Sequence, residues 1–220
     1  MINLYNEDCL DAMRKMETDQ YDLAIVDPPY GINASNKSFM RTGKRTGKSK
    51  CVSGLYKSSN WDHTKPSKEY FLELLRVSKN QIIWGGNYFI EYLNNTSCIL
   101  VWDKKNGKNR YSDFEMAWGS FKSAARMFSY KWHGMLQENM KNKEKRIHPT
   151  QKPVALYKWI LHNYAKEGDK ILDTHLGSGS IAVACHDMGF SLDGYELDTE
   201  YYTAACKRLR EHQRQLQLPI

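Results

Sequence analysis

The clearest chemistry in the chain lies in the four residues that follow the apolar run 23–26, namely Asp27, Pro28, Pro29 and Tyr30. The exocyclic amino group of adenine or cytosine is a poor nucleophile because its lone pair is delocalised into the ring. Acceptors that hold both amino hydrogens would localise that lone pair toward a methyl donor, and the Asp27 carboxylate and Pro28 carbonyl are suited to this role. The prolines fix φ and remove backbone donors, so these acceptors are held stiffly. Tyr30 is suited to stack on a base taken out of its helix.

A second element predicts the binding of a small ligand. The segment 170–188 has the pattern of a strand, a glycine turn with Gly177 and Gly179, and a helix. The following strand ends at Glu196, 19 residues after Gly177. In nucleotide-binding α/β folds an acid at this position accepts hydrogen bonds from ribose hydroxyls, so the pair indicates a ligand that contains adenosine. The pattern does not separate NAD from S-adenosylmethionine, and a structural turn with an incidental glutamate is the alternative.

Strands and helices alternate along the chain, which favours one domain over residues 1–220 with a mostly parallel sheet covered on both faces. Apolar, β-favouring runs predict strands at 2–5, 23–26, 81–84, 98–102, 114–118, 170–173 and 191–196. Helical spacing of apolar residues predicts helices at 10–16, 67–79, 154–164, 181–188 and 199–212. The same runs are too short to cross a membrane, so we expect no membrane partner.

Two basic segments interrupt this alternation, and the 32 Lys and Arg against 25 Asp and Glu give the chain a net charge of +7. Loops as long as 31–66 and 120–147 are usually functional or disordered. Their basic residues suit phosphate contacts, with Trp132 as an aromatic candidate for base contact. The alternative is a solvated surface loop. The candidate DNA-binding residues are Lys37, Arg41, Lys44, Arg45, Lys48, Arg126 and Lys131.

Five cysteines without CxxC spacing fit reduced thiols and predict neither a disulfide framework nor a metal site. The N-terminus has no basic start followed by an apolar run, so we expect no signal peptide. Together these features favour a cytoplasmic location.

The order of the motifs resembles that of the beta group of DNA amino-methyltransferases, over nearly the whole chain. DPPY (27–30) comes first, HPTQKPVAL (148–156) follows, and LDTHLGSGS (172–180) and GYELD (194–198) come last. This circularly rearranged order is typical of the beta group. The resemblance implies a Rossmann-like methyltransferase fold with seven strands, one of them antiparallel, S-adenosyl-L-methionine as cofactor and S-adenosyl-L-homocysteine as product.

The resemblance also implies roles for individual residues. Catalysis would fall to Asp27, Pro28, Pro29 and Tyr30. The cofactor would be held by Asp8, Cys9, Lys152, Asp173, His175, Gly177, Ser178, Gly179 and Glu196. Asp8 matches an acid near the cofactor's adenine, and Lys152 a position near its methionine end. The family's loop usually reads DPFxGSGT, so Thr174 and His175 replace a Pro and a Phe, and local packing is the alternative role for His175.

The implied function is methylation of adenine N6 in DNA at a short sequence by base flipping, in a bacterial or phage-encoded enzyme. Aspartate at the first DPPY position favours adenine, because cytosine-N4 enzymes of the family more often carry serine there. A cytosine-N4 enzyme, a methyltransferase for RNA or a protein amide, and an inactive DNA-binding partner are the alternatives. The short recognition segment 120–147 suggests a short target, a homodimer, or help from 31–66. A cognate restriction enzyme is a further candidate partner.

Overall fold

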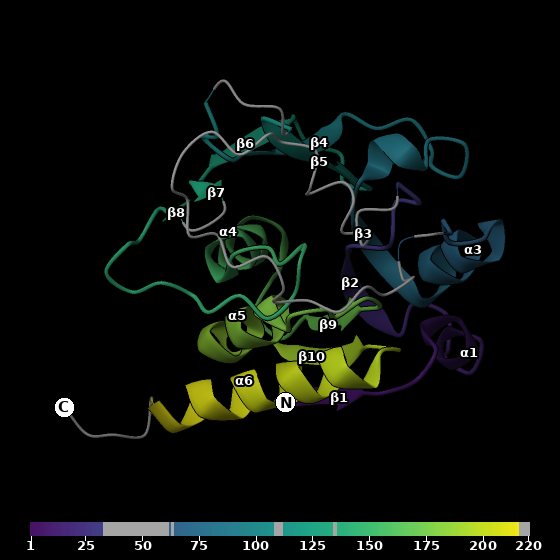
Figure 1. Ribbon diagram of the computed structural model, residues 1–220. Coiled ribbons are helices and arrows are strands. Elements are labelled where there is room, and N and C mark those ends of the chain that lie inside the picture. The colour runs from purple at the N-terminus through teal and green to yellow at the C-terminus, as the bar shows by residue number, and fades with distance from the viewer. Residues whose placement is uncertain (33–61, 63, 108–111, 134–135, 216–220) are drawn as a thin grey trace.

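The structure is a computed structural model that describes residues 1–32, 62, 64–107, 112–133 and 136–215. One large sheet lies at its centre (Figure 1). In the described part of the chain this sheet has eight strands in the order β1 (Ile2–Tyr5), β10 (Ser191–Tyr195), β9 (Lys170–Asp173), β2 (Tyr21–Val26), β3 (Ser78–Trp84), β5 (Phe114–Gly119), β4 (Cys98–Asp103) and β6 (Arg126–Ser129).

The strand directions agree with the expected class. Strands β1, β10, β9, β2 and β3 are parallel, β5 is antiparallel to both β3 and β4, and β6 pairs parallel to β4. One strand therefore runs against the others, as expected. The eighth strand, β6, adds to the seven that the sequence predicted.

Strands in 120–147 were not predicted, yet β6 and a separate antiparallel pair, β7 (Trp132–His133) and β8 (Leu136–Gln137), lie there. These strands are two to four residues long and mix polar with apolar residues. Such short segments carry too few residues for a period-2 pattern to be recognised.

Helices cover both faces of the sheet because successive strand residues point to opposite sides. Leu23 and Ile25 of β2 face a core shared with α4 (Val154–Tyr164) and α5 (Ser180–Met188). Ala24 and Val26 face a second core with α1 (Cys9–Met13) and α3 (Lys68–Val77). Helix α6 (Thr199–Gln215) lies beside α5 on the first side, as Figure 1 shows.

This topology collects the motif residues at one edge of the sheet. The parallel strands β2, β3, β9 and β10 all end there, so the residues that end or follow them, Asp27, Gly85, Asp173 and Glu196, are brought to that edge. Strand β5 runs the other way, so its beginning at Phe114 lies at the same edge. No helix in the described part of the chain is long and apolar enough to cross a membrane.

Candidate active site

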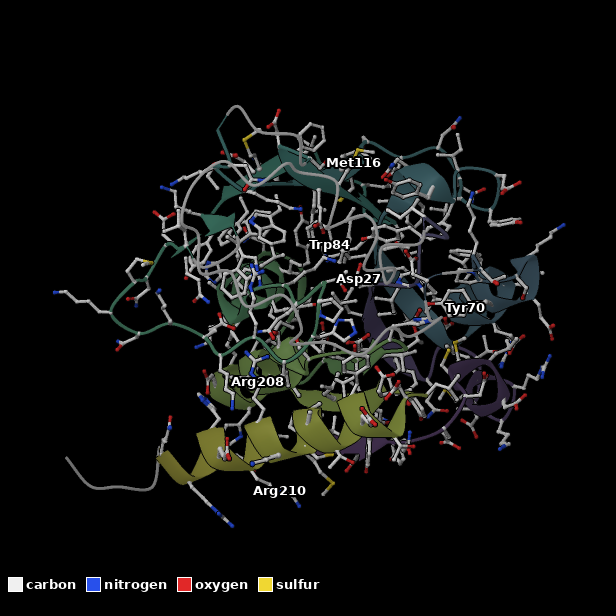
Figure 2. All side chains as sticks on the ribbon, viewed as in Figure 1. Asp27, Tyr70, Trp84, Met116, Arg208 and Arg210 are labelled. Atoms are coloured by element: carbon white, nitrogen blue, oxygen red, sulfur yellow. The ribbon has the colours of Figure 1, made fainter. Side chains whose placement is uncertain are left out.

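Asp27 follows the last residue of β2 with its carboxylate held at both oxygens. The Tyr30 hydroxyl donates to Oδ1 at 2.6 Å, and the Lys152 ammonium donates to Oδ2. The Asp27 side chain is 18% exposed, while that of Lys152 is 2% exposed. Figure 2 labels Asp27 and Trp84 near its centre, and the Lys152 ammonium, which pairs with Asp27, lies 5.3 Å from the Trp84 ring. A carboxylate has about four lone-pair sites, so these two donors leave acceptor capacity for a substrate amino group.

The Tyr30 ring is fixed by stacking and by a glycine. It stacks on Tyr88 of η1 (Gly86–Tyr88) with ring centroids 4.9 Å apart and planes 16° apart. A Cβ on Gly85, which has φ +68°, would lie 2.2 Å from a Tyr30 ring carbon. Burial, with Asp27 next, raises the pKa of Tyr30 well above its ordinary value, so its hydroxyl remains a donor. One face of the ring that the sequence assigned to base stacking is therefore occupied by Tyr88.

The turn after DPPY is tied down by a residue that the sequence did not single out. Asp62 is buried, and its carboxylate accepts a hydrogen bond from the Gly31 backbone N–H at 2.9 Å. The Lys65 ammonium donates to the Tyr88 carbonyl at 3.0 Å, on the neighbouring 3₁₀ turn. These contacts connect the chain before α3 to both aromatic residues of the site.

Lys152 points to the DPPY element, whereas the resemblance implied a position near the cofactor's methionine end. Its ammonium contacts Asp27 and lies 3.2 Å from Glu115 Oε2. Burial lowers the pKa of Lys152, but the two carboxylates more than offset it, so the pKa is raised and the ammonium keeps its charge. The cofactor-binding role predicted for Lys152 remains a prediction.

The glycine turn is joined directly to Glu196. The Gly177 N–H donates to Glu196 Oε2 at 2.8 Å, and the Asp198 N–H donates to Oε1 at 2.9 Å. Gly177 has φ +51° and Gly179 has φ +67°, in the left-handed region that glycine adopts without strain. A Cβ on Gly179 would also lie 3.1 Å from Ala205 of α6. The glutamate carboxylate is thus oriented at the strand edge, beside the turn.

Thr174 and His175, which differ from the family's usual loop sequence, form a local hydrogen-bond network with Tyr70. The Tyr70 hydroxyl bonds to Thr174 Oγ1 at 2.6 Å, and Thr174 Oγ1 bonds to His175 Nδ1 at 2.9 Å. The His175 ring also lies edge-on to Tyr70 at 5.4 Å, and burial lowers its pKa to about 4. These contacts favour the packing role for His175. Buried Asp173 accepts from the His175 N–H at 3.0 Å, and burial raises its pKa to about 8 despite that bond.

Asp8 and Cys9 have clear local roles. Asp8 caps α1, because its Oδ1 accepts from the backbone N–H of Leu10 at 2.8 Å and of Asp11 at 3.1 Å. The thiol of Cys9 is partly buried, and burial together with Asp8 raises its pKa to about 12, so it is protonated at neutral pH. The cap fixes the Asp8 carboxylate beside the end of β1.

A half-buried ion pair that the sequence did not predict joins α6 to the segment just before HPTQKP. Arg208 Nη2 lies 2.7 Å from Glu144 Oε2, and Nη1 donates to the Ser178 carbonyl at 3.0 Å and to Ser180 Oγ at 2.9 Å. Ser180 Oγ donates to the Lys152 carbonyl at 2.7 Å. Figure 2 shows Arg208 on the inner side of α6 and Arg210 on the outer side. The sequence signal for this ion pair was the single glutamate, Glu144, within the basic run 141–146.

The predicted DNA contacts fall into three groups. Arg126 and Lys131 are exposed, as a surface contact requires. Trp132 is buried, and its indole N–H donates to the Gln151 carbonyl at 2.8 Å, so its interpretation as a base contact is wrong and it is a packing residue. The remaining candidates, Lys37, Arg41, Lys44, Arg45 and Lys48, lie outside the described residues.

The hydrogen-bond acceptors at this edge fit an adenosine-containing cofactor. Glu196 and Asp8 offer carboxylates of the kind that accept from ribose hydroxyls and the adenine amino group. A Cβ on Gly177 would make only an ordinary contact, 3.7 Å from the His148 ring, so its φ of +51° is what favours glycine at this position. Burial, and then Lys152, lowers the pKa of His148 to about 4, so the ring is neutral. No group of His, Cys, Asp or Glu among the described residues is arranged to hold a metal ion.

Known proteins resemble this chain at the level of sequence and of fold. It is 24% identical over 238 residues to the Type II methyltransferase M2.DpnII of Streptococcus pneumoniae, covering 94% of this chain and 88% of that protein. It is 27% identical over 248 residues to the Type II methyltransferase M.HinfI of Haemophilus influenzae, covering 93% and 67%. The crystal structure of the M1.HpyAVI–SAM complex superposes with a TM-score of 0.57 at 22% identity, covering 95% of this chain and 100% of that one.

A match to a family model agrees with the motifs, with their position at one edge of the sheet, and with the similar proteins described above. Residues 75–207, more than half of the chain, match the model N6_N4_Mtase, described as DNA methylase. The chain therefore belongs to the N6_N4 family of DNA methylases.

Proposed function

We propose that the chain transfers a methyl group from S-adenosylmethionine to the N6 amino group of adenine in DNA. The observation that carries this proposal is the Asp27 carboxylate, fixed by Tyr30 and Lys152 at the sheet edge where Glu196 and the glycine turn also lie. Membership of a DNA methylase family and the likeness to two Type II methyltransferases support it.

The chain's own residues prepare the amino group. Asp27 and the Pro28 carbonyl accept its two hydrogens, which shifts lone-pair density onto the nitrogen. Preorganised acceptors of this kind reorganise little during the reaction. The base is flipped out of the duplex to reach them, and we assign its stacking to Tyr30, whose ring is already fixed by Tyr88 on one side. As the nitrogen gains its fourth substituent it loses a proton, and Asp27 is placed to take that proton or pass it to water.

S-adenosylmethionine supplies an electrophilic methyl group when bound. We assign its ribose to Glu196, its adenine to the edge beside Asp8 and Cys9, and its methionine end to Asp173 and the glycine turn with Ser178. Burial gives Asp173 a pKa of about 8 in the protein without ligand. A bound ammonium group would therefore favour the ionised form of Asp173, which strengthens their interaction.

Adenine is favoured over cytosine because an aspartate, not a serine, precedes the two prolines. The fold also resembles the PvuII cytosine-N4-specific DNA methyltransferase with a TM-score of 0.57 at 11% identity, so the fold does not separate the two bases. Cytosine N4 is the second candidate for this reason. The basic segments favour nucleic acid over a protein amide, and the DNA methylase family disfavours RNA.

Phosphate contacts are assigned to Arg126 and Lys131 and to the basic residues of 31–66. A short recognition segment leaves a homodimer and a cognate restriction enzyme as candidate partners, in the cytoplasm of a bacterium. Phosphate contacts of this kind make affinity fall with salt concentration.

Long-read mapping of modified bases in DNA from cells that express the chain tests the proposal. We expect N6-methyladenine within one short sequence, absent from cells that carry the empty vector. N4-methylcytosine at a fixed sequence would establish the second candidate. Unmodified DNA, together with methyl transfer to RNA or protein by the purified chain, would refute the proposal.

A further inference from the structure

Four buried or half-buried charges of alternating sign form a row that begins at Asp27. The Lys152 ammonium contacts Asp27 Oδ2 and lies 3.2 Å from Glu115 Oε2. The Lys104 ammonium lies 2.5 Å from the other Glu115 oxygen, Oε1. The side chains of Glu115 and Lys104 are 25% and 17% exposed. Neither residue belongs to the DPPY, HPTQKP or glycine-loop motifs.

The fold itself places Glu115 at the site. It is the second residue of the antiparallel strand β5, so it lies at the edge where the parallel strands end. It pairs with Trp102 of β4, and Lys104 follows the end of that strand. The Trp84 ring lies 5.3 Å from the Lys152 ammonium, which excludes water from one side of the ion pair.

Glu115 is in the ionised state that this arrangement needs. Burial raises its pKa, but Lys152 and Lys104 more than offset that effect, and the pKa falls to about 2. A buried ammonium is costly unless it is paired. With Glu115 present, Lys152 is shared between two carboxylates; without it, the ammonium would be drawn onto Asp27 alone.

We propose that Glu115, supported by Lys104, is a positioning residue for methyl transfer, which holds the Lys152 ammonium on one oxygen of Asp27. Asp27 then keeps its remaining acceptor sites directed at the substrate amino group, because Lys152 cannot slide across the carboxylate. Glu115 touches neither base nor cofactor in this account. The inference rests on the function proposed above.

The same geometry gives the proposal a signature in pH dependence. The titratable groups that face Lys152 lie on or beside β2, β5, α4 and β9, and they are Asp27, Tyr30, Glu115, His148 and Asp173. Tyr157 of α4 interacts with the two carboxylates, Asp27 and Glu115. Burial lowers the pKa of Lys152, and the charges of Asp27 and Glu115 raise it. Removing the Glu115 charge therefore lowers the pKa of Lys152 and brings its deprotonation toward the working pH range.

The test is Glu115→Gln, assayed as steady-state methyl transfer to DNA from pH 6 to pH 10. Glu138→Gln is the matched control, because Glu138 forms an exposed pair with Lys105, 3.4 Å away, at the same end of β4. We expect kcat to fall at least about tenfold with KM for both substrates within about twofold. We also expect Glu115→Gln to show an alkaline limb inside this pH range, below that of the parent protein, in which the pKa of Lys152 is raised above its ordinary value.

Glu115→Asp keeps the charge but withdraws the carboxylate by one methylene, so it should lower kcat without moving the alkaline limb. It also carries the test if Glu115→Gln does not fold. Parental kcat in both variants, or a loss in Glu115→Gln that is equal at every pH, would overturn the proposal. If the parent protein transfers no methyl group to DNA, the proposed function fails instead, which separates the two outcomes.

Discussion

Gly85→Ala tests whether the Tyr30 ring is held where Asp27 needs it. Gly85 has φ +68°, and an added Cβ would lie 2.2 to 2.7 Å from three Tyr30 ring carbons. The left-handed backbone alone costs an alanine about 1 kcal/mol. Displacing Tyr30 removes its stacking on Tyr88, worth about 1 kcal/mol, and its hydrogen bond to a charged carboxylate, worth about 1.5 to 3 kcal/mol.

Gly107→Ala is the matched control, because Gly107 has the same φ of +68° and an added Cβ would have no neighbour within 4 Å among the residues that the structure describes. At about 2 to 4 °C per kcal/mol for a chain of this size, the control should lower the melting temperature by a few degrees and Gly85→Ala by about 10 °C. Methyl transfer should fall more than about tenfold in Gly85→Ala, while binding of S-adenosylmethionine is retained. In a Tyr30→Ala background the ring is gone, so Gly85→Ala should cost no more than the control. Equal effects of the two glycine substitutions in the parent protein would show that close packing of Gly85 does not hold the Tyr30 ring in place.

Two further predictions concern the cofactor side. In the folded protein without ligand the pKa of Asp173 is raised from 3.8 to about 8, so its contribution to stability is present at low pH and is lost as pH rises toward 8. Between pH 5 and pH 8 the melting temperature should therefore fall less in Asp173→Asn than in the parent protein. Equal falls in the two proteins would contradict this. Arg208→Met should destabilise the fold by about 2 kcal/mol, because it removes the charged partner of the half-buried Glu144 carboxylate, and it should weaken binding of S-adenosylmethionine. Adding Glu144→Gln to Arg208→Met should recover part of the lost stability. If the losses of the two single substitutions in thermal melting simply added in the double variant, the pairing would be disproved.

Most of the sheet could be predicted because its strands are continuous apolar runs between turn signals. Strands β1 and β9 and helix α4 have the predicted bounds. The other predicted elements differ by up to three residues at an end, as Tyr21 and Ser78 show where they begin β2 and β3 earlier than the apolar runs. Strand β6 was missed because its four residues depend on pairing with β4, not on a local pattern.

The candidate site divides in the same way. Asp27, Gly177 and Glu196 could be predicted to share an edge because each follows a parallel strand. The contact from Lys152 to Asp27 joins residues 125 positions apart, and no local spacing encodes it. Glu115 carried one signal, a charge within the apolar strand FEMAWG, that gains meaning only when β5 is known to run antiparallel.

In the proposed reaction the Asp27 carboxylate activates the amino group of adenine. The most direct measurement compares the parent protein with Asp27→Ala by nucleoside mass spectrometry of methylated DNA, alongside calorimetric binding of S-adenosylmethionine. We expect N6-methyladenine from the parent, none from the variant, and cofactor binding in both. Methyl transfer by Asp27→Ala at a rate near that of the parent would contradict it.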